Sequence, residues 1–500
     1  MADTLVATEV DSIEADSIEA MSRALDAAPL DLGLHTRMLA ALRAAHDVAG
    51  SAAHELALAA FGMLGATHGD HSTHQPTPQP PPQHALVLYN IATVYAMNGR
   101  RKEAIRWYRL ALEIDPALAI AHQNLAATLD REGLADEARV HRERAYRLQR
   151  VFVDRALGTE TLRVLILGVG HGTGNVPIDA LLDAQTTTRI RYAIDCAGDA
   201  EDAQLPPHDV VFNGIGDADV AAPLAARLAR FADFAARRER PLLNAPDAIA
   251  HTHRHRLGEL LDGVPDVIVP RCVRLDARPS NEAALAAQLA QSELTLPLLL
   301  RPLAAHGGEG VTLHASLDSL WRALADLDAP CYLTAFHDFR AADGHYRKYR
   351  TLFVAGEPHP YHLAISRHWM VHYFSADMAG SPWKLNEEQH FLADPRAALG
   401  TRAHEAIRAI GARLGLAYGG VDFTLTADGR VLVFEANATM LAHRETPHGP
   451  FAHKNRYVER IIDAFGRMLR DAGDAGDAGD AGDAGDAGDA GDAGDAGTAR

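Results

Sequence analysis

Hydrophobic and polar positions along the chain change their period near residue 155. Over residues 12–66 and 85–150, Ala and Leu recur every three or four positions, which is the spacing of one face of a helix. From residue 162 onwards, apolar residues form short continuous runs such as RVLILG and DVVFN, which end in Gly-containing turns and are followed by helical segments. Continuous runs of this kind are typical of buried parallel strands. The pattern therefore predicts an all-α N-terminal region followed by an α/β region.

Small residues repeat at a fixed interval within the second helical stretch. They recur 34 positions apart at four places: Ala92 and Ala126, Gly99 and Gly133, Ala104 and Ala138, Ala111 and Ala145. The interval and the residue types resemble the tetratricopeptide repeat (TPR), in which paired helices touch at small side chains. Residues 85–150 resemble two such repeats, residues 12–66 a degenerate helical unit, and the Pro/Gln/His-rich residues 67–84 a linker. The resemblance implies a groove for a peptide or protein partner, or a homodimer contact; a plain helical cap is the alternative.

A hairpin is predicted near the C-terminus by Asp-Gly at 428–429, which stands between two alternating apolar runs. A two-residue loop at this point would set the register of both strands. Phe423 then lies opposite Phe434 on an apolar face, and Asp422 lies opposite Glu435 on the other face. The hairpin therefore holds two carboxylates that face each other.

The facing carboxylates predict a divalent cation. Directly opposed residues of an antiparallel pair lie about 5 Å apart at Cβ, so two anions there repel each other. Asn437, two residues beyond Glu435, adds an amide oxygen on the same face. Two carboxylates and an amide oxygen are hard ligands of the kind that suit Mg²⁺. Without metal, replacement of either acid is expected to stabilise the protein slightly. A solvent-facing hairpin with incidental acids is the alternative.

These residues resemble the ATP-grasp superfamily, over about Leu162 to Arg470. In that superfamily an Asp on one strand and a Glu-x-Asn on the next hold Mg²⁺ on the phosphates of ATP, and Asp422, Glu435 and Asn437 match that motif. The resemblance implies ATP and Mg²⁺ (or Mn²⁺) as cofactors. It also implies a Rossmann-like α/β subdomain at 160–245 and an ATP-grasp domain at 246–470.

Four other segments resemble superfamily elements in the same order. Residues 244–261 resemble the segment with an early phosphate-contacting base, and residues 296–311 the strand and Gly-rich loop that close over the phosphates, with Arg in place of the usual Lys. Residues 332–339 resemble the adenine-reading strand, although Ala335 replaces the usual Glu, and residues 346–366 the hairpin whose basic residues face the transferred phosphoryl group. The implied residues are Arg254, Arg301, Gly307, Gly308, Glu309, Gly310, Phe336, His337 and Asp338 for the nucleotide, and Arg350 and Lys348 for catalysis.

A Gly-rich turn follows the first apolar strand, at residues 168–174. Its spacing is GxGxGxG, whereas a dinucleotide-binding turn has GxGxxG and an acid about 20 residues later for the ribose. Asp195 is the candidate acid for such an NAD site. The alternative, which the ATP-grasp resemblance favours, is a structural or substrate-facing turn.

Histidines gather in the stretch PYHLAISRHWMVHY, as His359, His362, His368 and His372. A hydrolytic metal site would also need a carboxylate that orients the imidazoles. The preferred interpretation is that His362 or His368, together with His443, lines the substrate side of the cleft.

The resemblance implies an ATP- and Mg²⁺-dependent carboxylate–amine ligase. Such an enzyme activates a carboxylate as an acyl-phosphate, which an amine or a similar nucleophile then attacks. An ATP-dependent phosphotransferase on the same fold is one alternative. A non-catalytic TPR adaptor that retains a nucleotide pocket is another. The acid and the nucleophile are not identified by these residues.

Charge and cysteine content restrict the partners. The 500 residues carry a formal charge of −18, and nine of the acids lie in Asp-Ala-Gly triplets of the segment 471–500, so the rest of the chain carries −9. This balance argues against a nucleic-acid partner. Three widely spaced cysteines, no basic leader before an apolar stretch and no apolar run near 18 residues predict a cytoplasmic protein without a membrane partner. The triplets lack large apolar residues and predict a disordered tail.

Overall fold

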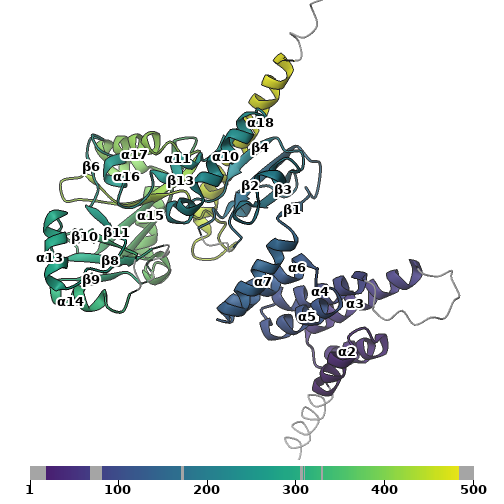
Figure 1. The fold of residues 1–500 in the computed structure, drawn as a ribbon. Coiled ribbons are helices and arrows are strands. Elements are labelled where there is room, and N and C mark those ends of the chain that lie inside the picture. Colours follow the sequence, from purple (N-terminus) through teal and green to yellow (C-terminus); the bar gives the residue numbers. More distant parts are fainter. Residues whose placement is uncertain are drawn as a thin grey trace, which may run out of the picture. The chain divides into compact units, whose positions relative to one another are not determined.

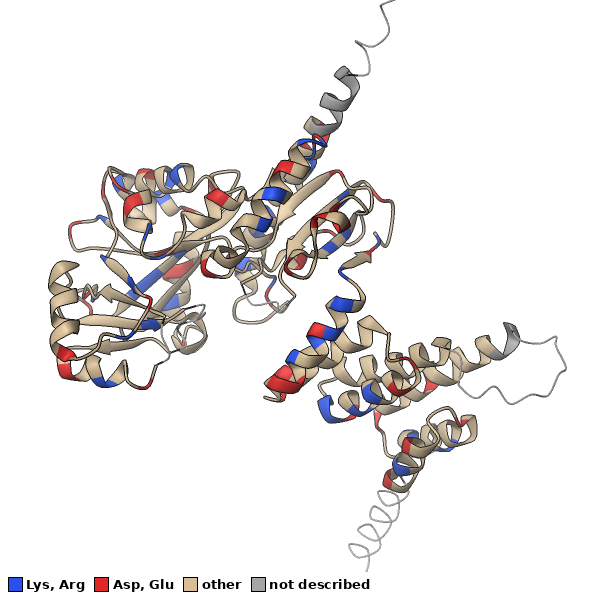
Figure 2. Ribbon diagram, viewed as in Figure 1, with Lys and Arg blue, Asp and Glu red and all other residues tan. Residues whose placement is uncertain are grey.

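The computed structural model describes residues 18–67, 82–170, 174–303, 308, 310–327 and 330–483. The chain forms two compact units, residues 1–150 and 151–500, which are described separately (Figure 1). Most of the predicted linker, part of the Gly-rich turn at 168–174, Gly307, Glu309 and the end of the predicted tail lie outside the described residues. Acidic and basic positions are interspersed along the helices of each unit (Figure 2). None of the described helices is long and apolar enough to cross a membrane.

The first unit is all-helical, as the sequence predicts. A helix over residues 18–27 precedes six more described helices. These are α2 (Leu32–Ala44), α3 (Val48–Thr67), α4 (Pro82–Met97), α5 (Arg101–Ile114), α6 (Ala119–Arg131) and α7 (Ala135–Leu148). Consecutive helices pack against each other around one apolar core, which includes Trp107 and Tyr108.

The 34-residue interval corresponds to a repeated helix pair, α4–α5 and α6–α7. Gly99 (φ 76°) and Gly133 (φ 79°) end the first helix of each pair in the left-handed region, where glycine is favoured. The repeated alanines are at most 1% exposed: Ala92, Ala104, Ala111, Ala126, Ala138 and Ala145. A larger side chain at these positions would push the helices apart.

The helix pairs α2–α3 and α6–α7 each contain the same kind of polar contact, a pair of histidines that joins the two helices. The Nδ1 atoms of His35 and His54 lie 2.8 Å apart, and those of His122 and His141 also lie 2.8 Å apart. In each pair the first imidazole directs Nε2 at the carbonyl oxygen of the proline six residues before it. The same side-chain arrangement therefore recurs in both helix pairs, which supports a related unit N-terminal to the clear repeats.

The second unit begins with a five-stranded sheet in the order β1-β3-β2-β4-β5. Four strands are parallel, and β1 joins the edge antiparallel. The strands are β1 (Val151–Asp154), β2 (Leu162–Gly168), β3 (Thr187–Ala193), β4 (Val210–Asn213) and β5 (Leu242–Leu243). The runs RVLILG and DVVFN are β2 and β4, so the parallel α/β prediction for this region is confirmed.

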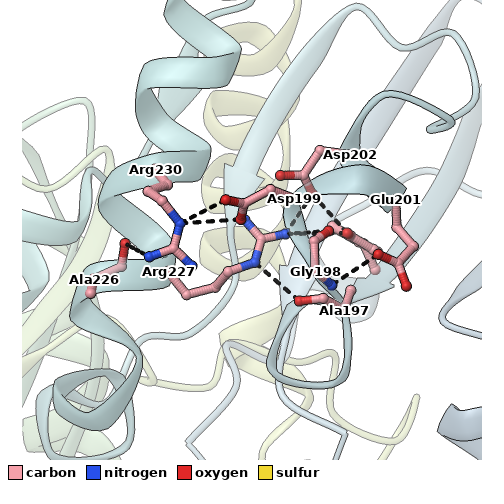
Figure 3. A network of polar contacts seen from close by, with 9 residues as sticks. Ala197, Gly198, Asp199, Glu201, Asp202, Ala226, Arg227 and Arg230 are labelled. Carbon is pink, nitrogen blue, oxygen red and sulfur yellow. Dashed lines mark hydrogen bonds and ion pairs between the residues drawn. The ribbon is translucent and has the colours of Figure 1, made fainter.

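A polar network fixes helix α10 (Ala225–Ala236) to the short helix α8 (Asp199–Asp202) (Figure 3). Arg227 pairs with Asp202, which is 3% exposed in its side chain and also accepts a hydrogen bond of 2.7 Å from the Tyr192 hydroxyl on β3. On the outer side Arg230 Nε lies 2.8 Å from Asp199. Each buried charge therefore has a partner, which a buried ion needs to be tolerated.

In the Gly-rich turn after β2, the carboxylate of Asp195 accepts hydrogen bonds from the backbone of the turn. The Gly170 N–H lies 3.0 and 3.1 Å from the two carboxylate oxygens of Asp195. Gly174 has φ of +83°, and a Cβ there would lie 2.6 Å from Val220. The described part of the turn is therefore a tight structural turn, and Asp195 closes it; this arrangement does not support the NAD alternative.

Two further sheets follow. The first is antiparallel in the order β7-β10-β8-β9, with helices α13 (Glu282–Gln291) and α14 (Leu317–Ala323) forming a small apolar core with it. Its strands are β7 (Cys272–Leu275), β8 (Leu298–Pro302), β9 (Thr312–His314) and β10 (Cys331–Ala335). The second has the order β12-β11-β13-β14-β6, and β6 is parallel to β14. Its strands are β6 (Val267–Ile268), β11 (Tyr346–Val354), β12 (Glu357–Ser366), β13 (Tyr418–Leu425) and β14 (Val431–Asn437).

Helices α15 (Pro382–Ala393), α16 (Pro395–Leu399) and α17 (Thr401–Leu414) accompany the second sheet, and α15 and α17 contact β12. Phe353, Phe391 and Phe423 are buried in the large core that these elements share with the first sheet of the unit. The side chains that project from the opposite face of the sheet remain available for the site.

The prediction that residues 471–500 are disordered is wrong for residues 471–483, which continue helix α18 (Asn455–Asp483). Ile461, Phe465 and Leu469 form a fully buried stripe at intervals of four residues, and Gly473 is the next position on it. A Cβ at Gly473 would contact Leu162 at 3.7 Å. The first triplet therefore continues the packed helix face, which composition alone does not reveal. Residues 484–500 lie outside the described residues.

Candidate functional site

The predicted hairpin is β13–β14, and Asp422 pairs with Glu435 as the sequence predicts. The loop is different. Thr426 N–H donates to the Arg430 carbonyl (2.9 Å), and Gly429 has φ of 80°, which gives a three-residue turn. Next to this longer turn, each residue of β13 pairs with the residue of β14 one position before the predicted one, so that Phe423 pairs with Val433 and not with Phe434. A bulge at Phe434 then restores the predicted register at the acids. Phe434, expected on the apolar face, lines the cavity described below instead.

The two acids belong to a row of polar residues that crosses four strands. On β12 His362 lies opposite Arg350 of β11, Arg350 lies opposite Asp422 of β13, and Asp422 lies opposite Glu435 of β14. We call these four residues the transverse row. Lys348 stands on the same face, two residues before Arg350. One face of the sheet therefore carries two neighbouring acids at one end of the row, with Arg350 and Lys348 beside Asp422 and His362 at the other end.

Asp422 is 1% exposed and fully paired. Its carboxylate accepts two hydrogen bonds from Arg350, at 2.6 Å from Nε and 2.8 Å from Nη2, and Lys348 Nζ lies 3.0 Å away. Burial alone would raise the pKa of this carboxyl, but Arg350 and Lys348 outweigh burial and hold the pKa well below its usual range. Asp422 is therefore ionised throughout the physiological range.

Glu435 has its own pair of cations. Arg254 Nη2 donates to its carboxylate, and Arg301 Nη1 lies 3.8 Å from the same oxygen. Burial opposes ionisation, but the two arginines lower the pKa of Glu435 to about 2. The expectation that two uncompensated anions repel across the hairpin is therefore wrong. Four basic side chains from other strands and loops neutralise them.

A cavity of about 250 Å³ opens between the sheet β7-β10-β8-β9 and the sheet β12-β11-β13-β14-β6, over this row. The residues predicted from sequence that line it are Arg254, Arg301, Gly308, Phe336, His337, Lys348, Arg350, His362, Asp422 and Glu435. His368 and His443, which were also expected beside the cleft, are not among the described residues that line it. They come from positions up to 181 residues apart in the chain. Gly308 has φ of +83°, a left-handed conformation that favours glycine. Its neighbours Gly307 and Glu309 lie outside the described residues.

Three predicted residues have other contacts. The Asn437 carboxamide oxygen accepts hydrogen bonds from Thr439, at 3.0 Å from the backbone N–H and 2.9 Å from the hydroxyl, so it serves the turn after β14. Asp338 is exposed and accepts a hydrogen bond from the Arg340 N–H. A Cβ at Gly310 would lie 2.9 Å from Pro302, so this glycine lets the loop pack against β8. None of the three is among the described residues that line the cavity.

Sequence reasoning missed an aromatic part of the cavity. Trp369 contacts Phe336 edge to face with ring centroids 5.7 Å apart, and Phe339 contacts Phe434 at 4.8 Å. Met370 lies beside Gly308, 3.3 Å from where its Cβ would be. The signal for this wall was the stretch RHWMVHYF directly after β12, which is too aromatic for an ordinary exposed loop.

The donor chemistry fits a divalent cation that arrives with an anionic ligand. Asp422 and Glu435 offer hard oxygen atoms from adjacent strands, but each already holds a basic side chain. A metal ion alone would have to displace those bases without giving them a new anion. Among the residues that the structure describes, no three His, Cys, Asp or Glu side chains lie close enough to hold a metal ion. The structure therefore gives no support to a hydrolytic metal site at His359, His362, His368 and His372.

Comparisons with known proteins add a set of structural likenesses. No protein-family model and no curated protein sequence matches the chain. Similar solved structures include D-alanine–D-alanine ligase from Bacillus anthracis with ATP, at 14% identity and TM-score 0.38, covering 63% of this chain and 99% of that one. Another is carboxyaminoimidazole ribonucleotide synthase from Aspergillus clavatus with ATP, at 17% identity and TM-score 0.36, covering 61% and 77%. A third is a RimK domain ATP-grasp protein from Sphaerobacter thermophilus, at 17% identity and TM-score 0.34, covering 62% and 98%. These values are too low to assign an activity.

Proposed function

We propose that residues 151–500 form an ATP- and Mg²⁺-dependent ligase of the ATP-grasp type. It activates a carboxylate as an acyl-phosphate for attack by an amine or a similar nucleophile. The observation that supports this proposal is one cavity in which four bases surround two opposed, ionised acids. These are Arg254, Arg301, Lys348 and Arg350 around Asp422 and Glu435.

The bases are suited to take the phosphates of a nucleotide. Arg301 is partly buried beside Arg254, and both its partial burial and this neighbouring charge lower the pKa of Arg301. An additional anion between the two guanidinium groups would relieve that repulsion. When phosphates enter, the arginines can exchange one anion for another, because a guanidinium binds carboxylate and phosphate with the same fork geometry. Asp422 and Glu435 then become available to hold Mg²⁺.

The aromatic wall is suited to a nucleobase. Phe339 and Phe434 form an apolar surface at the cavity, and Leu299 and Leu432 also line it. A purine face gains from stacking against such side chains. Ala335 offers no acceptor side chain, so recognition of the base would rest on backbone groups of residues 335–337.

Arg350 and Lys348 are proposed to stabilise the phosphoryl group during transfer. Both line the cavity, and both contact Asp422, so they are held in place by the acid that would bind the metal. Fixed positive charge at the site where negative charge moves is the main contribution of a protein to phosphoryl transfer. Mg²⁺, when bound, supplies further neutralisation of the phosphate oxygens.

The helical unit is proposed to be a TPR domain. Its repeated helix pairs share buried alanines and left-handed glycines at the 34-residue interval. Repeats of this kind stack into curved arrays with a binding face. We propose that this face holds a peptide or protein partner, which includes a protein substrate or a second copy of the chain.

The test is a two-step assay on the full chain. Thermal shift with and without Mg–ATP measures binding, and ADP release is then measured with a pool of standard amino acids and short dicarboxylates, with and without ammonia as nucleophile. Acid-dependent ADP release that rises with the nucleophile supports the ligase. ADP release with a phosphorylated acceptor as product would indicate a phosphotransferase. Binding without turnover would indicate an adaptor.

The matched variants are Arg350→Met and Arg444→Met. Arg350 lies in the cavity, whereas Arg444 forms an ion pair with Glu459 at 2.6 Å, with both side chains about half exposed. Loss of Mg–ATP-dependent stabilisation and turnover in the first variant only would assign the effect to the cavity. Equal behaviour of both variants contradicts the proposal.

A further inference from the structure

The transverse row has a direction. Glu435 and Asp422 stand at one end, Arg350 follows, and His362 closes the other end on β12. Neighbouring strands are about 4.8 Å apart, so the backbone of His362 lies about 14 Å from that of Glu435 but only about 5 Å from that of Arg350. Under the proposed function, metal and phosphates occupy the acidic end. Under the same proposal, the acyl carbon that the nucleophile attacks lies on the side of the phosphates that is nearer to His362.

The His362 side chain is buried but incompletely bonded. It is 6% exposed and lines the cavity. Its ring is stacked on Tyr373, with centroids 4.8 Å apart and an angle of 26° between the planes. Nε2 is buried and forms no hydrogen bond with any residue that the structure describes. A buried polar atom without a partner costs about 1–3 kcal/mol, so its retention indicates a ligand or a reacting group as the partner.

The surroundings of His362 keep the imidazole neutral. Burial and the neighbouring bases place the pKa of His362 well below its ordinary value. The titratable groups around it come from β11, β12, α15, the segment after β12 and the segment before α18. They are Lys348, Arg350, Tyr361, His372, Tyr373, Glu388, Glu445 and Lys454. A neutral imidazole can accept a proton, whereas an imidazolium cannot.

The ring is also held firmly. Tyr373, on which it stacks, donates its hydroxyl to Glu388 at 3.1 Å. Lys454 Nζ lies 4.5 Å above the Tyr373 ring and is paired with Glu445 at 2.6 Å. Behind Tyr373, Lys454 is therefore paired with Glu445, and Glu388 contacts both the Tyr373 hydroxyl and His453 Nε2, which lies 2.9 Å away. The ring on which His362 stacks is thus fixed from behind.

We infer that His362 is the catalytic base that accepts the proton of the attacking nucleophile. This inference rests on the proposed ligase function. The nucleophile's nitrogen lone pair forms the C–N bond to the acyl carbon of the acyl-phosphate. The C–O bond to the phosphate breaks, and its electron pair leaves with the phosphate. One N–H proton passes to the unprotonated ring nitrogen of His362, and the imidazolium releases it to the departing phosphate.

The structure favours His362 over His372 for this role. His372 also lines the cavity, but it is more exposed and stands outside the transverse row, on the segment that follows β12. His359 is a suitable control, because it lies on β12 like His362, is half-buried and does not line the cavity. A variant of His359 perturbs the same strand without touching the reacting groups.

The experiment separates activation of the acid from attack by the amine. Full-length parent, His362→Gly, His372→Asn and His359→Asn are given Mg–ATP and the pool of amino acids and dicarboxylates. Hydroxylamine traps the acyl-phosphate as a hydroxamate. It is unprotonated at neutral pH and depends little on a positioned base. Ammonia or an amino acid gives the amide, and the acid found with the parent is used thereafter.

We expect His362→Gly to retain hydroxamate formation within about threefold while amide formation falls about 10²–10⁴-fold, the usual contribution of a general base. Added imidazole should restore amide formation in His362→Gly and in neither other variant. Loss of the hydroxamate as well, with the thermal melt unchanged, would make His362 part of the activation step and overturn the inference. So would retention of amide formation, or a larger loss in His372→Asn. If the parent forms no hydroxamate, the proposed function itself fails, and this inference falls with it.

A folding defect in His362→Gly is distinguished by His362→Asn, which keeps a polar side chain of moderate size. This variant should melt like the parent and show the same selective loss of amide formation. A His362→Asn protein that melts like the parent and forms amide at the parental rate would also overturn the inference.

Discussion

Replacement of Glu435 by Gln should destabilise the protein without nucleotide. The change removes the charge that neutralises Arg254 and lies 3.8 Å from Arg301, and it leaves two neighbouring guanidinium groups in the cavity without that anion. The pKa of Glu435, about 2 against an ordinary 4.5, corresponds to about 3 kcal/mol of favourable interaction with the charged form. The side chains of Arg254 and Glu435 are 22% and 21% exposed, so the 3–5 kcal/mol that loss of one partner costs in a fully buried ion pair is an upper limit here. We therefore expect a loss of about 3 kcal/mol in the free energy of unfolding of this unit.

The pH dependence supplies a second check. Because the folded pKa of Glu435 is lowered, its contribution is complete above the unfolded value of 4.5 and is lost as pH falls towards about 2. The difference between parent and Glu435→Gln should therefore be constant from pH 8 to about pH 5 and shrink below that. Urea unfolding at several pH values, followed by tryptophan fluorescence, measures this difference.

Nucleotide should widen the difference in stability between the two proteins, because only the parent is expected to bind it. A ligand at 100 times its Kd stabilises the protein that binds it by about 2.7 kcal/mol. Mg–ATP should give such a shift in the parent and none in Glu435→Gln. As a control, Glu459→Gln removes a half-exposed ion pair with Arg444 and should cost at most about 1 kcal/mol. A Glu435→Gln protein as stable as the parent, or more stable, would refute the assignment of Arg254 and Arg301 as its partners.

Three further outcomes are expected. A chain that begins at residue 151 should retain Mg–ATP affinity within a few-fold, measured by calorimetry; complete loss in a folded fragment would contradict the independence of the two units. Deletion of residues 484–500 should leave the melting temperature unchanged, whereas deletion from 471 should lower it by a few degrees, because Ala472 and Gly473 pack on the unit; equal melts would contradict that packing. Acidification below pH 6.5 should progressively destabilise the 1–150 fragment. Burial lowers the pKa of His54 to about 3, so the unfolded chain binds a proton at this residue more readily than the folded one. A His54→Gln fragment whose helical circular-dichroism signal falls with pH as the parent's does would contradict this.

Much of the architecture could be predicted from the local spacing of residues along the chain. The 34-residue interval predicted repeated helix pairs, because small residues and left-handed glycines are needed wherever such helices touch and end. Strand alternation predicted that Asp422 faces Glu435, because the side-chain period of a strand is two. The turn was predicted one residue too short, and the β-bulge at Phe434 compensated for that error. A bulge depends on packing against neighbouring strands, which no short pattern encodes.

By itself the sequence determined the helical unit, the parallel strands and the facing pair of acids, all of which depend on residues near one another in the chain. Only the tertiary structure decided what those acids contact. Arg350 is 72 residues from Asp422, and Arg254 is 181 residues from Glu435. Similarly, the transverse row ends at His362 because β12 lies beside β11 and β11 beside β13. Charges buried at such a junction must be paired, and the pairing follows from sheet order and helix packing, which local spacing does not contain.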